Sequence, residues 1–337
     1  MERPGEGAPA EVCPPHGARP MSTARDRTTE TRPDAAEAPA TADADQVSAV
    51  REAAPRQGIS PPMFEAAGAS APGPDRPVNQ DAFGLWPDLG LCVVADGMGG
   101  RPAGEVAARL AVAEVHAFLA ESDPERTPPI AWDVSRGLAA GMLARAVAQA
   151  NQAVHAEGLR QPAWKGMGAA VAALLVAGPR IVAAHVGDVR VYRCRGGGLE
   201  KLTEDHSQAA AYEKWRGETA DPEVVRRQRR VLTQAVGPAP TVRVTLAVEG
   251  IEAGDVFLVC SDGLWGSLTH DAMAREIAGA PGLHGAAAAL VSSALRAGGT
   301  DDVTAVLVQP LRGGSRRGTD LASSGVPSPR WAEASAA

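Results

Sequence analysis

The chain has 337 residues, which is enough for one large domain or two. Hydrophobic residues make up 45% of it and aromatic residues only 4%, so a core must be built mainly from Ala, Val and Leu. The formal net charge of −7 gives no strong attraction to nucleic acid or to an anionic membrane surface, and we expect neither as a partner.

The two ends of the chain differ in composition from its middle. Residues 1–60 contain no Leu, Phe, Trp or Tyr and hold eight of the 27 prolines. Such a segment buries too little apolar surface to offset the entropy lost on ordering, so we predict that it is disordered. Residues 313–337, rich in Ser, Gly, Arg and Ala, give the same prediction. One domain then remains, over residues 61–312.

No signal or membrane segment is predicted. The N-terminus has no apolar core of the kind found in secretory signals. The most apolar stretch, residues 168–186, is interrupted by Gly178-Pro179-Arg180, which favours two strands and a turn over a membrane span. We therefore expect a cytoplasmic protein.

Apolar periodicity predicts mixed secondary structure within the domain. Short strands are expected near residue 63 and over residues 82–86, 91–95, 169–176, 181–186, 190–193, 242–248, 256–260 and 303–308. Helices are expected over residues 103–121, 138–157, 270–278 and 285–297, with a charged, helical segment over 208–231. This order lacks the regular alternation of a parallel doubly wound sheet. It favours an α+β fold in which helices cover antiparallel sheets.

Carboxylates stand at the ends of five predicted strands: Asp81, Asp96, Asp188, Asp262 and the pair Asp301-Asp302. Any one of them is explained by an Asp-Gly turn that closes a hairpin. Together, at one edge of a pair of sheets, they would repel one another strongly. Two divalent cations would relieve that repulsion, and oxygen ligands without His or Cys favour Mg²⁺ or Mn²⁺ over Zn²⁺. Such a centre is suited to activating water for attack on phosphorus.

Six motifs in order carry a resemblance. They are Arg76…Asn79-Gln80-Asp81, Val94-Ala95-Asp96-Gly97-Met98-Gly99-Gly100, His185-Val186-Gly187-Asp188-Val189-Arg190-Val191-Tyr192, Leu202-Thr203-Glu204-Asp205-His206-Ser207, Cys260-Ser261-Asp262-Gly263-Leu264 and Thr300-Asp301-Asp302-Val303-Thr304. Over roughly residues 63–310 the chain resembles the type 2C, metal-dependent Ser/Thr protein phosphatases (the PPM family), in their bacterial form. The resemblance implies a four-layer αββα sandwich, in which helix pairs flank two antiparallel sheets.

The resemblance also implies a set of metal ligands. By position, Asp96 would bridge two ions of Mn²⁺ or Mg²⁺, and the carbonyl of Gly97 would bind one of them. Asp262 and Asp301 would bind the other ion. Asp188 matches a residue that helps to bind a third ion in bacterial members.

Two further residues would act on the substrate. Asp81 would orient a metal-bound water, so we count it with both the metal site and the catalytic residues. Arg76 would hold the substrate phosphate, to which its planar guanidinium is well matched. Residues 208–231 correspond to the mobile flap beside the site.

Several positions differ from the usual pattern of the family. Gln80 replaces a Glu seen in many members, which weakens one water-mediated metal contact. Met98 stands where eukaryotic members have a His thought to act as general acid, although bacterial members often have Met. Asp302 replaces the usual Asn, and Ala169-Ala170 replaces a Thr pair. None of these changes removes a direct metal ligand.

The function predicted from the sequence is metal-dependent hydrolysis of phosphoserine and phosphothreonine in proteins, opposing bacterial Ser/Thr kinases. We expect a monomer whose partners are phosphorylated proteins and a kinase. A catalytically silent module that binds phosphoproteins is the alternative, but the intact Asp96, Asp262 and Asp301 argue against it. A haloacid-dehalogenase-type hydrolase would need a nucleophilic Asp-x-Asp, and a P-loop enzyme would need Gly-Lys-Ser/Thr after its glycines.

Two features stay open between a functional and a structural interpretation. The run Arg226-Arg227-Gln228-Arg229-Arg230 either recognises an acidic or phosphorylated partner or forms a solvated helix face. For His206, a role in capping a loop is favoured over catalysis.

Overall fold

The computed structural model describes residues 64–98, 103–122 and 137–311. The predicted disordered segments 1–60 and 313–337 lie outside these residues, as do Gly99 and Gly100 of the glycine loop. The proposed domain limits of 61–312 therefore remain a prediction.

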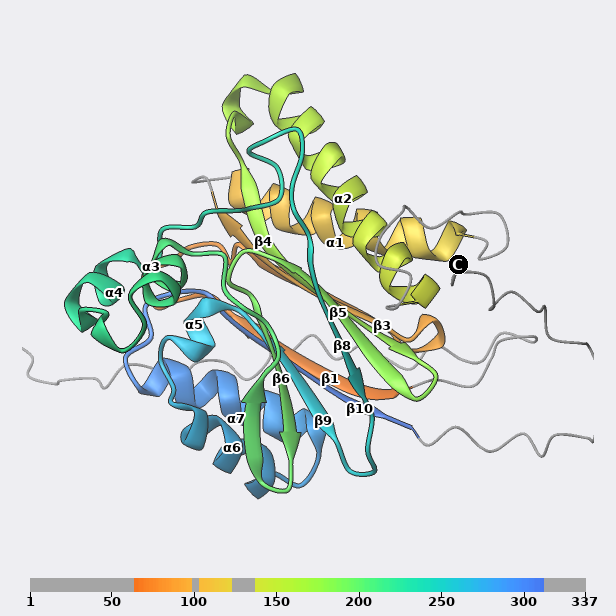
Figure 1. Ribbon diagram of the computed structural model, residues 1–337, viewed down its shortest axis with the longest axis vertical. Coiled ribbons are helices and arrows are strands. Elements are labelled where there is room, and N and C mark those ends of the chain that lie inside the picture. Colours follow the sequence, from red (N-terminus) through yellow and green to blue (C-terminus); the bar gives the residue numbers. More distant parts are fainter. Residues whose placement is uncertain (1–63, 99–102, 123–136, 312–337) are drawn as a thin grey trace, which may run out of the picture. The chain divides into compact units, whose positions relative to one another are not determined.

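Two antiparallel sheets of five strands each form the centre of the fold (Figure 1). One sheet has the order β1-β10-β9-β6-β7 and the other β2-β3-β4-β5-β8. The first contains β1 (Phe64–Ala71), β10 (Val303–Pro310), β9 (Val256–Cys260), β6 (Arg190–Arg195) and β7 (Gly198–Lys201). The second contains β2 (Asp81–Trp86), β3 (Leu91–Met98), β4 (Gly168–Ala177), β5 (Arg180–Val186) and β8 (Thr245–Gly250).

Helix pairs cover the outer faces of both sheets. Helices α1 (Ala103–Glu121) and α2 (Gly137–Arg160) pack on the β2-β3-β4-β5-β8 sheet, whereas α6 (His270–Gly279) and α7 (Leu283–Arg296) pack on the other (Figure 1). A separate apolar layer lies between the sheets and includes Val94, Ala172 and Val259. The predicted αββα sandwich is thus confirmed. Within the described ranges, no helix combines the length and the apolar character needed to cross a membrane.

A third group of helices projects beside the sandwich. It consists of α3 (Gln208–Arg216) and α4 (Pro222–Gln228), and a one-turn helix α5 (Asp262–Trp265) follows β9. Gly217 ends α3 with a φ of 55°, in the region that favours glycine, which explains why the charged segment forms two pieces. Residues 208–231 were expected to be helical, and most of them are.

The predicted elements agree with the structure except at a few points. The strand expected over residues 91–95 runs on to Met98, so Asp96 and Gly97 lie within β3 and not in a loop. The strand expected over residues 242–248 begins only at Thr245. Strand β7 and helix α5 were not predicted, because four-residue elements leave too little periodicity to detect.

Candidate active site

The first pair of site carboxylates lies on neighbouring strands. In the register of β2 and β3, Asp81 is directly opposite Asp96. Like charges in this arrangement destabilise a sheet, because the side chains of opposed residues are neighbours. Two opposed aspartates are therefore not explained by the stability of the sheet and are expected only where another role requires them.

The other sheet brings further carboxylates to the same place. Asp262 is the first residue of α5, two residues after the end of β9, and Asp301 lies two residues before β10. The charges of Asp81, Asp188, Asp262 and Asp301 all act on Asp96. The structure thus brings together the five carboxylates that the sequence places at strand ends.

Hydrogen bonds fix one oxygen of Asp81 and leave the other without a partner. The hydroxyls of Ser261 and Thr304 each donate to Asp81 Oδ2 over 2.7 Å. Thr304 Oγ1 in turn lies 2.7 Å from the hydroxyl of Ser70, which accepts from Asn79 Nδ2 over 2.7 Å. Asp81 Oδ1 is buried and has no hydrogen-bond partner among the described residues. A buried carboxylate oxygen in this state is costly unless a cation or a water reaches it.

The pKa values of these carboxyls show how strongly the cluster disfavours negative charge. Burial raises the pKa of Asp81 to about 7, against the opposing hydrogen bonds from Ser261 and Thr304. Burial and the charge of Asp81 hold the pKa of Asp96 well above its usual value. Burial and the charge of Asp301 raise the pKa of Asp262 to about 6. Without a counter-charge, the cluster holds protons that isolated aspartates would release near pH 4.

Asp188 lies in the turn between β5 and β6 and belongs to the same cluster. Burial and the charge of Asp262 raise its pKa to about 7. Its backbone carbonyl accepts a hydrogen bond from the indole of Trp265 over 3.0 Å. The guanidinium of Arg190 lies 3.5 Å from the centre of the Trp265 ring and forms an ion pair of 2.6 Å with Asp205. Trp265 is thereby fixed next to the site.

Gly97 stands where two backbones approach closely. A Cβ atom at this position would lie 2.1 Å from the carbonyl oxygen of Gly104 in α1 and 2.6 Å from that of Gln80. The amide of Gly97 also donates to the Gln80 carbonyl over 3.2 Å. Only glycine allows β3 to pass this close to the first turn of α1.

Arg76 lies at the mouth of the cluster, held by two carboxylates. Its Nη2 is 2.6 Å from Asp301 Oδ1, and its Nη1 is 3.1 Å from Asp302 Oδ2. Asp302 is buried and also accepts hydrogen bonds from the backbone amides of Gly73 and Gln80. The carboxylate of Asp302, which replaces the usual Asn, therefore has hydrogen-bond donors for its oxygens. It joins the loop before β2 to the start of β10.

The site has the chemistry of a metal centre, but its side chains are not arranged around an ion. Among the described residues, no three His, Cys, Asp or Glu side chains form a group that could hold a metal. Asp301 instead pairs with Arg76, and Arg230 approaches it to 3.9 Å. The donors still fit a hard cation, because they are all oxygens and because Asp262 Oδ1, like Asp81 Oδ1, is buried without a partner in the described part of the chain.

Three residues make contacts in the site although they were assigned no individual role from the sequence. They are Ser261 and Thr304, which lie in the motifs, and Arg230, which lies in the arginine run. Only their positions in the sequence could have identified them: Ser261 precedes Asp262, and Thr304 lies in the last motif. His206 is structural, as favoured: its Nδ1 accepts from the amide of Gly187 over 3.2 Å, and burial lowers its pKa to about 4.

Comparisons with known proteins agree with this geometry. The family model described as protein phosphatase 2C matches residues 75–297. The Serine/threonine protein phosphatase PstP of Mycobacterium tuberculosis is 32% identical over 254 residues, which cover 72% of this chain and 46% of PstP. A crystal structure of M. tuberculosis PstP/Ppp is 30% identical, with a TM-score of 0.64, and the match covers 74% of this chain and 99% of that one. The chain therefore belongs to the protein phosphatase 2C family.

Another structure shows what a relative binds. The catalytic domain of PstP in complex with two manganese ions is 29% identical, with a TM-score of 0.63 over 74% of this chain and 99% of that one. The present chain spans about half the length of the PstP sequences that it matches.

Proposed function

We propose that this chain hydrolyses phosphoserine and phosphothreonine in proteins with the help of Mn²⁺ or Mg²⁺. The observation that carries the proposal is the meeting of five carboxylates from two sheets beside a partly exposed arginine. Membership of the family and the manganese ions in the related PstP domain support the same activity. A structural role alone gives no reason to leave two buried carboxylate oxygens without partners.

In this proposal Asp96, the Gly97 carbonyl, Asp262 and Asp301 hold two ions, and Asp188 contributes to a third. When bound, the metal pair supplies a lowered pKa for water and positive charge for in-line displacement at phosphorus. Asp301 must then turn from Arg76 and Arg230, with which it pairs in the structure.

Two residues of the chain act on the reactants. Asp81 Oδ2 is fixed by two hydroxyls, so its free Oδ1 accepts a hydrogen bond from the attacking water and orients it. The side chain of Arg76 is 35% exposed and offers its guanidinium N–H groups to the phosphate oxygens. When Asp301 binds metal, Asp302 remains to hold Arg76 in place.

Met98 ends β3 at the edge of the site and cannot donate a proton, because it carries a thioether. We infer that solvent supplies the proton to the leaving alkoxide of the substrate.

The cellular setting belongs to the same proposal. The substrates are proteins phosphorylated by a Ser/Thr kinase, which this enzyme opposes. We propose that it acts in the cytoplasm as a monomer.

The test is release of phosphate from a phosphothreonine peptide by the full chain, with Mn²⁺ and with a chelator. Turnover that depends on Mn²⁺ supports the proposal, and full turnover in the chelator contradicts it. Binding of the phosphopeptide without turnover under any metal condition would instead favour a module that recognises phosphoproteins.

A further inference from the structure

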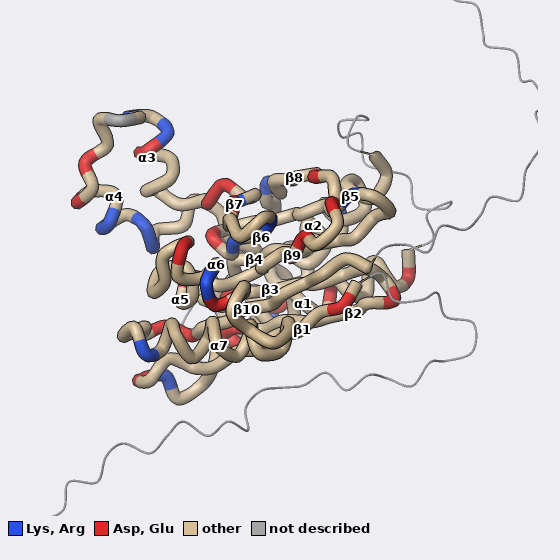
Figure 2. Tube along the Cα trace, turned by 90° about the horizontal axis from the view of Figure 1, so that it is seen from below, with Lys and Arg blue, Asp and Glu red and all other residues tan. Residues whose placement is uncertain are grey.

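The arginine run of residues 226–230 divides between two environments. Arg226, Arg229 and Arg230 line a cavity of about 250 Å³, whereas Arg227 lies in the same run but does not line it. Figure 2 shows the Lys and Arg residues of α3 and α4 on the part of the chain that stands beside the sandwich. All four arginines are exposed to solvent, but only Arg226, Arg229 and Arg230 also line the cavity, so the two interpretations left open by the sequence both apply to the run.

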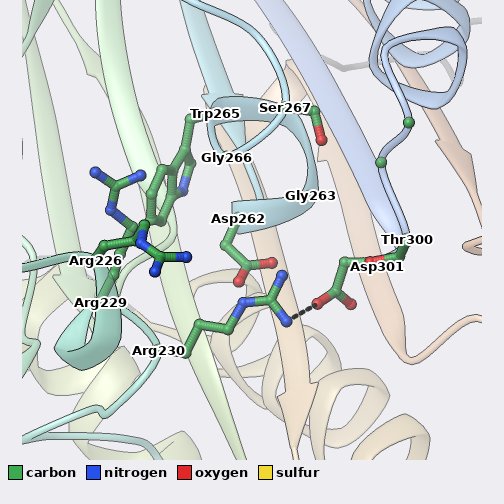
Figure 3. Close-up of a pocket in the computed structure, with 12 residues that line it drawn as sticks. Arg226, Arg229, Arg230, Asp262, Gly263, Trp265, Gly266, Ser267, Thr300 and Asp301 are labelled. Atoms are coloured by element: carbon green, nitrogen blue, oxygen red, sulfur yellow. Dashed lines mark ion pairs between the residues drawn. The ribbon is translucent and has the colours of Figure 1, made fainter. Parts of the chain in front are cut away.

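The cavity adjoins the proposed reaction centre. Asp262 and Asp301 form part of its lining, and Arg230 reaches between them to within 3.9 Å of Asp301 (Figure 3). Arg226 and Arg229 lie farther along, on the side of Trp265 (Figure 3). Once the two aspartates are neutralised by metal, three positive side chains determine the charge of this cavity. It then favours anions.

The far side of the cavity offers unused hydrogen-bond donors. Ser267 and Thr300 line it, and neither hydroxyl has a hydrogen-bond partner among the described residues. Arg229 has no acidic partner within the described ranges, and its guanidinium lies 6.0 Å from the centre of the Trp265 ring. Trp265 is itself fixed by Asp188 and Arg190, and Arg229 lies at the outer limit of a cation–π contact with its ring.

We propose that this cavity binds a second anionic side chain of the substrate, close in sequence to the phosphorylated residue. Arg226 and Arg229 would receive a phosphoryl group or a carboxylate while Arg76 holds the scissile phosphate, and the hydroxyls of Ser267 and Thr300 offer further donors across the cavity. The proposal rests on the phosphatase activity proposed above and names its preferred substrates: segments with a second phosphorylated or acidic residue.

Two features favour a substrate anion over a purely structural role. Within the described ranges, Arg226 pairs only with Glu223, an exposed residue on the same helix, so its charge remains available at little cost. The cavity also has room for a side chain beside the site, and a guanidinium binds a phosphoryl group through paired N–H donors.

The test compares three peptides that share one phosphothreonine. They differ at a single position, two to four residues from the phosphothreonine, which holds Ala, Glu or phosphoserine. The KM of the full chain is measured with saturating Mn²⁺, for the parent, for R226Q/R229Q and for the matched control R227Q. In a second arm, fluorescence anisotropy at saturating Mn²⁺ measures the binding of the same labelled peptides with a non-hydrolysable phosphonate in place of the phosphothreonine phosphate. Turnover of an aryl phosphate reports on the reaction centre alone.

We expect the parent and R227Q to show a KM at least about tenfold lower for the phosphoserine peptide than for the Ala peptide, as one charge-assisted contact would give. The Glu peptide should fall between them. R226Q/R229Q should lose this preference in both arms and keep the parent's turnover of the aryl phosphate. Equal KM and binding for all peptides in the parent, or an unchanged preference in R226Q/R229Q, would overturn the inference. Failure to hydrolyse the aryl phosphate would instead contradict the proposed function, and the binding arm would still decide the inference.

Discussion

The two ends of strand β9 carry aspartates in opposite electrostatic situations, Asp255 buried and Asp262 half-buried. Asp255 precedes the strand, and its carboxylate lies 2.7 Å from Arg195 Nε and accepts from the amide of Glu252 over 2.8 Å. Burial alone raises the pKa of Asp255, but these hydrogen bonds outweigh it and lower the pKa below its usual value. Asp262 follows the same strand, and burial and the charge of Asp301 raise its pKa against the opposing charges of Arg230 and Arg76.

This difference separates a structural carboxylate from a functional one. At the Asp255 end, the fold supplies its own cation and the charge is compensated. At the Asp262 end, several carboxylates repel one another, and two of their oxygens have no partner in the described part of the chain. The cost of that arrangement makes sense if a cation from solution compensates it.

The largest expected effect comes from neutralising one ligand. Asp96→Asn should lower phosphopeptide turnover at least about a hundredfold, or about 2.7 kcal/mol in the barrier. In a chelator the same change should stabilise the protein, because it removes one of the repelling charges. The melting temperature should rise by about 2–4 °C for each kcal/mol relieved. Lower stability in the chelator would show that the cluster is not repulsive.

The matched substitution Asp255→Asn, at the other end of β9, should lower stability and leave turnover almost unchanged. Asp255→Asn leaves the guanidinium of Arg195 without its buried partner and should cost about 1–3 kcal/mol of the free energy of unfolding. Turnover at saturating Mn²⁺ should stay close to that of the parent. Urea denaturation and phosphate release measure the two effects, and a large loss of turnover would mean that the two ends are not independent.

The dependence of stability on pH should also report on the carboxylate cluster around Asp262. Asp81 and Asp188 have pKa values raised to about 7, so the native state binds more protons than the unfolded chain between about pH 4 and pH 7. Stability in a chelator should therefore fall as the pH rises through this range. Unfolding in urea at pH 5 and pH 8 measures this change, and it should be smaller in Asp96→Asn. A rise in stability over the same range would contradict the assignment.

The smallest effect is expected at Met98. If this residue has no part in proton transfer, Met98→Ala should keep turnover of a phosphoserine peptide and of an aryl phosphate within a few-fold of the parent. A positioned proton donor typically contributes about 10²–10⁴-fold. A hundredfold loss for the peptide alone would therefore show a role for the Met98 side chain.

The sequence predicts the layers of this fold well, because apolar periodicity depends on burial and both faces of each sheet are covered. Helix 103–121 was predicted with the bounds that α1 has in the structure. The extension of β3 through Asp96 was missed, since a carboxylate and a glycine normally end a strand. Pairing of Asp96 with Asp81 of β2, and of residues 96–98 with residues 168–170 of β4, continues the strand there.

The site was predicted as a set of residues but not as an arrangement. Motif order identifies the carboxylates, whereas contacts such as those of Asp302 with Gly73 and Arg76 join residues more than 220 positions apart. Local patterns carry no information on such contacts. The pairing of Asp301 with Arg76 and Arg230 was therefore unexpected.

The central claim is that the acidic end of the sandwich is a cation site, and calorimetric titration with Mn²⁺ tests it most directly. The parent and Asp255→Asn should each bind at least two ions per chain, and Asp96→Asn should lose most of that binding. Absence of Mn²⁺ binding in the parent, or equal binding in Asp96→Asn, would contradict the account.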